Sequence, residues 1–184
     1  MENHLSDLEL VALINDGDWS ALDGLYQRHR DWAFRLALRF VGHRDDALDV
    51  VQEAFTYIVT LFPGFELTAK FTTFLYPVIR HRALRAIRIR RRMIGGVDDD
   101  LLHLAPAPAD ERSASRAELA DVIATLPNAQ REVVLMRFVD GFTNDEIATA
   151  LEIPAGTVKS RLHNALAALR DDPKTRRYFG QEDP

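Results

Sequence analysis

Four polar side chains near the C-terminal end of the chain have the chemistry to hydrogen-bond with the edges of nucleic acid bases. In the run AGTVKSRLHNALAALR, residues 155–170, apolar residues recur at helical spacing, and the side chains that fall away from them are Lys159, Ser160, His163 and Asn164. Lysine donates well to guanine, and asparagine has the geometry for adenine. The spacing predicts a helix that reads bases in a major groove. A helical hairpin with an ordinary solvated face is the alternative.

No pattern typical of an enzyme occurs in the sequence. The six histidines are scattered, none of them in an H-E-x-x-H spacing, and there is no glycine-rich phosphate loop and no G-x-S-x-G. Because cysteine is absent, the chain has no thiolate nucleophile, disulfide or cysteine zinc site, and a reducing compartment suits it. Three adjacent acids, Asp98 to Asp100, lie in a segment without the fixed geometry that a divalent ion requires. We therefore predict no catalysis, no cofactor and no metal.

A recognition helix needs a helix before it, and the sequence predicts one. Thr143 and Glu146 have the T-x-x-E spacing of a capping box, which marks a helix start. Ile147, Ala148 and Leu151 then give a buried face, and a short break follows at residues 152–156. Two short helices that meet at a tight corner form a helix-turn-helix.

Helical patterns cover most of the remaining chain, and no alternating strand pattern stands out. A capping box of Ser6 and Glu9 marks the start of the first helix, and glycine and proline mark the ends of later helices. The expected helices are residues 6–15, 22–41, 45–61, 71–92, 115–126 and 128–139. His29 is expected at the edge of a helical core. Ser115 and Glu118 are expected as the capping box of the second half. The segment from 93 to 114, rich in glycine, aspartate, alanine and proline, is expected to be a flexible linker.

Charge is unevenly distributed along the chain. The formal net charge is -5, yet seven arginines and no acid occur between residues 80 and 92, whereas acids gather near the N-terminus, at 45–53, at 98–100 and in the tail. This segregation predicts one surface for DNA and a separate surface for a protein partner. No segment reaches the roughly 18 uninterrupted apolar residues of a membrane span, so a cytoplasmic protein is expected.

The run EIATALEIPAGTVKSRLHNALAALR resembles the promoter-reading end of bacterial sigma factors of the sigma-70 family, of the extracytoplasmic-function type. Blocks from about Leu22 to Arg170 follow the order of that family. The resemblance implies an all-α protein with a region 2 helical bundle at 1–92, a linker at 93–114, a region 4 helix-turn-helix domain at 115–172 and a tail at 173–184. It also implies binding to core RNA polymerase and promoter-specific initiation of transcription. A stand-alone helix-turn-helix regulator that binds an operator without polymerase is the alternative.

The resemblance also carries functional roles onto particular residues. In DALDVVQEAF it implies contacts with the polymerase clamp by Asp46, Asp49, Gln52 and Glu53, for which a plain solvated helix face is the alternative. The resemblance further implies that the loop after this helix receives a flipped base of the minus-ten element and that the next helix holds the edge of the duplex. The residues implied to bind the minus-ten element are Glu66, Leu67, Thr68, Ala69, Lys70, Tyr76, Arg80, Arg82, Arg85 and Arg88. Packing in the core is the alternative role for Tyr76. The minus-thirty-five element would contact Thr157, Lys159, Ser160, Arg161, His163 and Asn164.

The implied partners are promoter DNA, the clamp helices and flap of core polymerase, and a regulatory protein such as an anti-sigma factor. The acidic segment 98–100 resembles a transcript in charge, and a plain tether is its alternative role. The chain departs from the family pattern at four positions, which are Leu48 in place of an acid, Pro77 in place of Arg, His81 in place of Asn, and Asn164 in place of Arg. Proline inside a helix removes one hydrogen bond and crowds the preceding turn, so we expect a kink at Pro77 or a late helix start.

Overall fold

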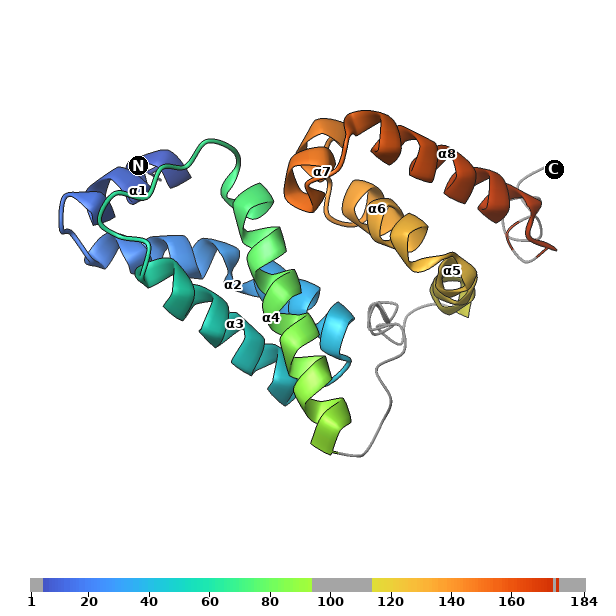
Figure 1. Cartoon of the computed structure of the whole chain (residues 1–184), viewed down its shortest axis with the longest axis horizontal. Coiled ribbons are helices and arrows are strands. Elements are labelled where there is room, and N and C mark those ends of the chain that lie inside the picture. The colour runs from blue at the N-terminus through green and yellow to red at the C-terminus, as the bar shows by residue number, and fades with distance from the viewer. Residues whose placement is uncertain (1–4, 94–113, 174, 176–184) are drawn as a thin grey trace. The chain divides into compact units, whose positions relative to one another are not determined.

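The computed structural model describes residues 5–93, 114–173 and 175, and within these ranges it contains eight helices and no strand (Figure 1). The chain divides into two compact units, Met1–Leu101 and Leu102–Pro184. The expected all-α class is confirmed. Residues 94–113 of the expected linker, with the acids at 98–100, and most of the expected tail lie outside the described residues.

The first unit contains α1 (Asp7–Asn15), α2 (Ser20–Val41), α3 (Arg44–Val59) and α4 (Phe71–Met93). The long helix α2 packs against each of the other three, and α3 packs against α4. One core results, with leucine, isoleucine and aromatic side chains from all four helices almost completely buried, among them Ile14, Leu25, Leu36, Ile58, Leu75 and Ile79. The predicted inward residues of α3, at 50, 51, 54, 55 and 58, are all buried.

The predicted helix ends of this unit are confirmed at two places. The Ser6 hydroxyl accepts a hydrogen bond from the Glu9 amide at 3.3 Å, and together with the bond from the Ser6 amide to the Glu9 carboxylate this completes the capping box. The Glu9 carboxylate accepts hydrogen bonds from the Ser6 amide at 2.7 Å and from the Ser6 hydroxyl at 2.7 Å. These bonds, the one from the backbone first, lower the pKa of Glu9 below its usual value. At the end of α2, Gly42 adopts a φ of 75°, a conformation that glycine reaches without a Cβ penalty.

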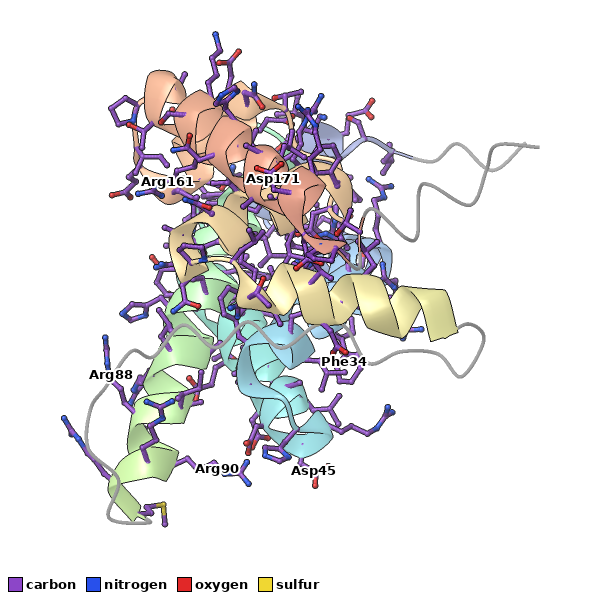
Figure 2. The ribbon with its side chains drawn as sticks, turned by 90° about the vertical axis from the view of Figure 1, so that its right-hand side faces the viewer. Phe34, Asp45, Arg88, Arg90, Arg161 and Asp171 are labelled. Carbon is purple, nitrogen blue, oxygen red and sulfur yellow. The ribbon has the colours of Figure 1, made fainter. Side chains whose placement is uncertain are left out.

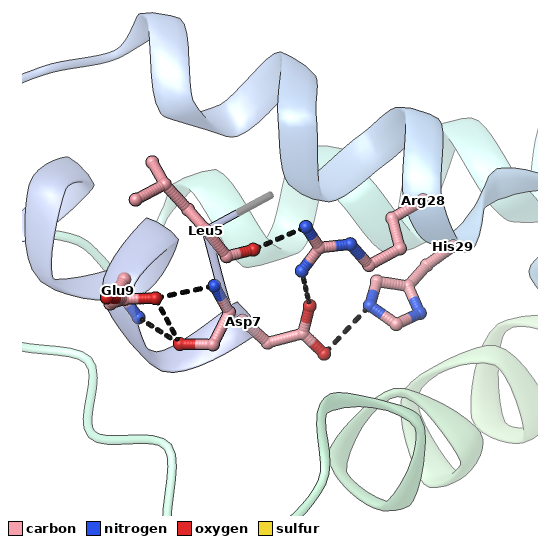
Figure 3. A network of polar contacts seen from close by, with 6 residues as sticks. Leu5, Asp7, Glu9, Arg28 and His29 are labelled. Carbon is pink, nitrogen blue, oxygen red and sulfur yellow. Dashed lines mark hydrogen bonds and ion pairs between the residues drawn. The ribbon is translucent and has the colours of Figure 1, made fainter. Parts of the chain in front are cut away.

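A polar network fastens α1 to α2 (Figure 3). Asp7, the first residue of α1, accepts a hydrogen bond from Arg28, and its second carboxylate oxygen lies 3.0 Å from Nε2 of His29. Arg28 also donates to the carbonyl of Leu5. The His29 ring is buried and lies 4.8 Å, between ring centres, from Phe71 of α4. The expected role of His29 at the edge of the core is confirmed.

Helix α4 continues through Pro77. It begins at Phe71, as expected for the helix at residues 71–92, so of the two effects expected of Pro77 the late start does not occur. Pro77 has no N–H to donate to the carbonyl one turn earlier, but the residues around it, Leu75, Tyr76 and Ile79, are completely buried. Tertiary packing therefore holds the helix where local propensity disfavours it.

The second unit contains α5 (Ala114–Thr125), α6 (Asn128–Phe138), α7 (Asn144–Leu151) and α8 (Ala155–Asp171). Helices α6, α7 and α8 pack on one another around Val133, Met136 and Ile147. Arg131 of α6 is buried and donates to the carbonyls of Ala124 and, at 2.9 Å, of Leu126, which ties the end of α5 to α6.

One predicted helix start in this unit is wrong. Helix α5 already includes Ala114, so Ser115 lies inside the helix and is not the residue that caps it. Serine is tolerated within helices as well as favoured at their ends, and its spacing to Glu118 alone does not distinguish the two positions. Of the helices that the structure describes, none is both long enough and apolar enough to cross a membrane.

Candidate functional site

Local hydrogen bonds fix the start of α7 and the turn between α7 and α8, which together form the helix-turn-helix of the second unit. The Thr143 hydroxyl accepts from the Glu146 amide at 3.2 Å, and the Glu146 carboxylate accepts from the Thr143 amide at 2.7 Å. Helix α7 ends at Leu151, and the next residue, Glu152, adopts a φ of 54° although it is not glycine. The Ile153 amide then donates to the carbonyl of Ala148 at 3.0 Å, and α8 follows directly. The predicted capping box and tight corner are both confirmed.

Helix α8 separates its buried and exposed faces as the sequence predicts. Val158, Leu162 and Ala165 are buried, whereas the four base-reading candidates, Lys159, Ser160, His163 and Asn164, are all exposed. The other two candidates, Thr157 and Arg161, are half-buried. The hydroxyl of Ser160 donates to the carbonyl of Thr157 at 3.0 Å, so its oxygen remains as an acceptor.

Leu166 belongs to the apolar residues that recur at helical spacing in α8, and it was expected to be buried with them, but it is 41 % exposed. It lines an apolar groove of about 620 Å³ on the second unit. Side chains of α5, α6 and α8 form this groove together, and Phe138 at its edge is 62 % exposed. The face is apolar enough to pack against another protein element.

The candidate polymerase contacts lie along one face of α3. Asp49, Gln52 and Glu53 are exposed and Asp46 is half-buried, and the spacing of three, six and seven residues from Asp46 places them in one row. A groove of about 540 Å³ lies between this row and α4, lined by Asp49, Gln52, Glu53, Thr56, Tyr57, Thr60, Arg82 and Arg85.

Arginines of α4 reach across to this acidic row. Arg90 forms an ion pair with Asp46, and the guanidinium groups of Arg82 and Arg85 lie 3.8 and 3.9 Å from the Glu53 carboxylate. Arg82 also lies over the ring of Tyr57, 5.1 Å from its centre. The acidic row of α3 and the arginines of α4 therefore adjoin in the first unit. The cause is the packing of α3 beside α4, which brings their charged edges together.

The four arginines of α4 that are candidates for DNA binding differ in exposure. Arg85 and Arg88 are exposed, whereas Arg80 and Arg82 are half-buried. In Figure 2 Arg88 points away from the bundle, and Arg90 points toward the start of α3, where Asp45 lies.

Tyr76 does not present its ring to a base. It is only 1 % exposed, and its ring lies 6.3 Å from that of Phe40 in an edge-on arrangement. Its burial supports the alternative role in the core over the role in DNA binding, because a base cannot stack on a ring that is already covered.

The loop between α3 and α4 presents the other minus-ten candidates. Glu66, Thr68 and Lys70 are exposed, and Leu67 and Ala69 are half-buried. Asn15, at the end of α1, hydrogen-bonds to the backbone just before this loop at Gly64 and Phe65. Sequence reasoning missed Asn15, because nothing in a sequence links it to a loop some fifty residues later.

Leu48 lies on the opposite side of α3 from α4. It is 49 % exposed and lines an apolar groove of about 620 Å³ between α2 and α3, together with Trp19, Tyr26 and Phe55. Among the described residues no group of histidines and acids is arranged to hold a metal ion.

Two family models match the chain, in the order in which the two units occur. The model of sigma-70 region 2 matches residues 25–93, and the model of sigma-70 region 4 matches residues 116–169. The first match covers α3, the loop and α4, and the second covers the helix-turn-helix.

Curated relatives match over nearly the whole length. The chain is 30 % identical to the RNA polymerase sigma-H factor of Pseudomonas aeruginosa over 176 residues, which are 89 % of this chain and 91 % of the relative. It is 27 % identical to the ECF RNA polymerase sigma factor SigW of Bacillus subtilis over 173 residues, 87 % of this chain and 92 % of the relative.

Solved structures share the fold. CnrH, in complex with the cytosolic domain of CnrY, has a TM-score of 0.65 and 21 % identity, with 96 % of this chain and 99 % of that chain covered. The sigma factor RpoE of Bartonella quintana, in complex with the anti-sigma factor NepR, has a TM-score of 0.63 and 18 % identity, with 88 % and 98 % covered.

Proposed function

The chain belongs to the sigma-70 family of RNA polymerase sigma factors, in its extracytoplasmic-function type, and from this membership we propose which of its residues bind polymerase and which read the promoter. Its function is to bind core RNA polymerase and direct promoter-specific initiation of transcription. The observation that carries this is the presence of both sigma regions in one chain, because a stand-alone operator-binding regulator has no use for a region 2. We assign region 2 to 1–92 and region 4 to 115–172, and the cytoplasm as the place of action.

Transcription with purified components tests the function. Core polymerase with the chain should give specific run-off transcripts from a subset of genomic fragments, and core alone should not. An operator-binding regulator would instead occupy its sites at full affinity without core and give no transcript.

The acidic row of α3 is the proposed polymerase-binding face. Asp46, Asp49, Gln52 and Glu53 offer carboxylate and amide groups along a single exposed edge, which suits a partner helix rich in lysine and arginine. The negative charge of this face orients the chain as it approaches core polymerase. The groove between this face and α4 has room for the long basic side chains of the partner.

The loop and α4 are the proposed minus-ten surface. The loop Glu66 to Lys70 would take the flipped base, and Arg80, Arg82, Arg85 and Arg88 would lie along the phosphates at the duplex edge. Capture of a base out of the stack needs a fixed pocket and nearby positive charge. The loop would supply the pocket and the arginines of α4 the charge, and α4 begins directly after the loop.

Arg88 offers a sharp test of the phosphate contacts, because it is exposed and Figure 2 shows it pointing away from the bundle. Arg88→Ala should weaken promoter complexes of the holoenzyme equally on all sequences and reduce the slope of log affinity against log salt by about one. Arg35→Ala, on an exposed arginine of α2, is the matched control and should leave the slope unchanged. An unchanged slope for Arg88→Ala would mean that this part of α4 is only a solvated helix face.

The exposed face of α8 is the proposed minus-thirty-five surface. Lys159 and Asn164 are assigned to base edges and Arg161 to phosphate, with Thr157, Ser160 and His163 beside them. The apolar groove of the second unit, edged by Phe138 and Leu166, is the proposed contact for the polymerase flap, since an apolar helix would cover it.

A regulatory protein is a further proposed partner. CnrH and RpoE were both solved in complex with another protein, the latter with the anti-sigma factor NepR. The exposed apolar residues on both units, such as Leu48 and Phe138, suit a partner that binds when polymerase does not.

A further inference from the structure

Asn15 links the end of α1 to the backbone that leads into the minus-ten loop. Its side-chain oxygen accepts hydrogen bonds from the amides of Gly64 at 2.7 Å and Phe65 at 3.2 Å. Its side-chain nitrogen donates to the carbonyl of Phe65 at 2.9 Å. One amide side chain thus satisfies three backbone groups that no helix or strand supplies with partners.

The ring of Phe65 is held at the same point. It lies 5.4 Å from the Phe62 ring and 4.7 Å from the Phe74 ring, between ring centres, at the start of α4. At the other end of the loop, the carbonyl of Lys70 accepts from the amides of Thr73 and Phe74 in the first turn of α4. The segment Glu66 to Lys70 is therefore fixed at both of its ends, and the side chain of Asn15 provides the fixation at its beginning.

We propose that Asn15 is a positioning residue for promoter melting, which sets the conformation in which the loop Glu66–Lys70 receives the flipped base of the minus-ten element. This inference rests on the proposed role of the loop. It adds a residue of α1, which lies before the segment matched by the region 2 model, residues 25–93. A loop held in its bound conformation before the base arrives does not have to be ordered at the moment of binding, and this strengthens discrimination between bases.

Replacement of the side chain separates the positioning role from a purely structural one. Asn15→Ala removes all three bonds, and Asn15→Asp keeps the accepting oxygens but loses the donor to Phe65. The neighbouring Asp16→Ala is the matched control, because Asp16 is exposed and belongs to the same end of α1. Thermal unfolding of each variant checks that the first unit remains folded.

The measurement is run-off transcription by holoenzyme on a promoter of the chain, with each base in turn at the position that is flipped, and with permanganate reactivity as the report of strand opening. Asn15→Ala should lower the preference for the cognate minus-ten base by about 3- to 10-fold, which is the size of effect that a single intramolecular hydrogen bond contributes. Asn15→Asp should fall between Asn15→Ala and the parent. Preference at the minus-thirty-five element and co-elution with core should not change in any variant.

The outcomes are distinguishable. If the parent prefers a minus-ten base and Asn15→Ala keeps that preference in full, the role of Asn15 is refuted and the role of the loop stands. If Asn15→Ala loses preference equally at both elements, the effect is general and the positioning role is again refuted. A parent without any preference at the minus-ten base overturns both the loop assignment and the inference drawn from it.

Discussion

The double variant Asp46→Lys, Asp49→Lys is expected to lose association with core polymerase. Both carboxylates lie on the acidic row of α3, and Asp49 is exposed at the groove beside α4. Reversing two charges in the middle of a charge-complementary interface should cost about 2 to 5 kcal/mol for a pair that is desolvated on binding. Co-elution of the purified variant with core, compared with the parent, measures the loss.

Two controls make this result specific. Asp31→Lys introduces the same reversal at an exposed acid of α2, whose side chain is 78 % exposed, and should leave co-elution intact. The single variant Asp49→Lys avoids the ion pair between Asp46 and Arg90 and should show most of the effect without disturbing the packing of α3 on α4. Normal co-elution of a folded double variant would show that the acidic row is solvated surface and that core binds elsewhere.

Lys159→Ala and Asn164→Ala are expected to change which minus-thirty-five sequences the holoenzyme accepts. Both side chains are exposed on α8, whereas Val158 and Leu162 are buried. Each variant should lose about 1 to 3 kcal/mol of discrimination, at different base pairs, because a side chain that reads a base edge contributes about that much against the wrong base. Run-off transcription from a promoter library with a randomised upstream element measures the preference.

Arg161→Ala is the contrasting variant. Arg161 is half-buried on α8 and is assigned to phosphate, so its loss should weaken all promoters to the same degree and leave the base preference as it was. If Lys159→Ala and Asn164→Ala retain the parental base preference, the recognition face has been assigned to the wrong side of α8.

The elements of the fold were predictable because their signals are local. The capping boxes at Ser6 and Thr143 and the glycine end at Gly42 depend on residues within one turn, and the apolar spacing of α3 depends on one helix face. Local signals could not decide whether Pro77 delays the start of α4, because they indicated both a helix from residue 71 and a late start. The stability of α4 comes from the burial of Leu75, Tyr76 and Ile79 against other helices, which no local propensity contains.

The candidate site was predictable residue by residue but not in its connections. The exposure of Lys159 and Asn164 follows from helical spacing, whereas the burial of Tyr76 depends on where α2 lies. The bonds from Asn15 to Phe65 and the ion pair of Asp46 with Arg90 join residues that are 50 and 44 positions apart. Sequence patterns describe neighbours in the chain, so contacts at such separations appear only when the fold is known.

The ion pairs between α3 and α4 make the phenotypes of their residues epistatic. Arg90 forms an ion pair with Asp46, and Arg82 and Arg85 both lie near the carboxylate of Glu53. A substitution on either helix therefore changes the electrostatic environment of the other. A variant selected for a defect in polymerase binding will therefore carry a smaller defect in promoter binding, and the reverse also holds. The effects of two substitutions, one on α3 and one on α4, will not be additive. Evolution of the promoter-binding arginines in this chain is thereby coupled to evolution of its polymerase-binding acids.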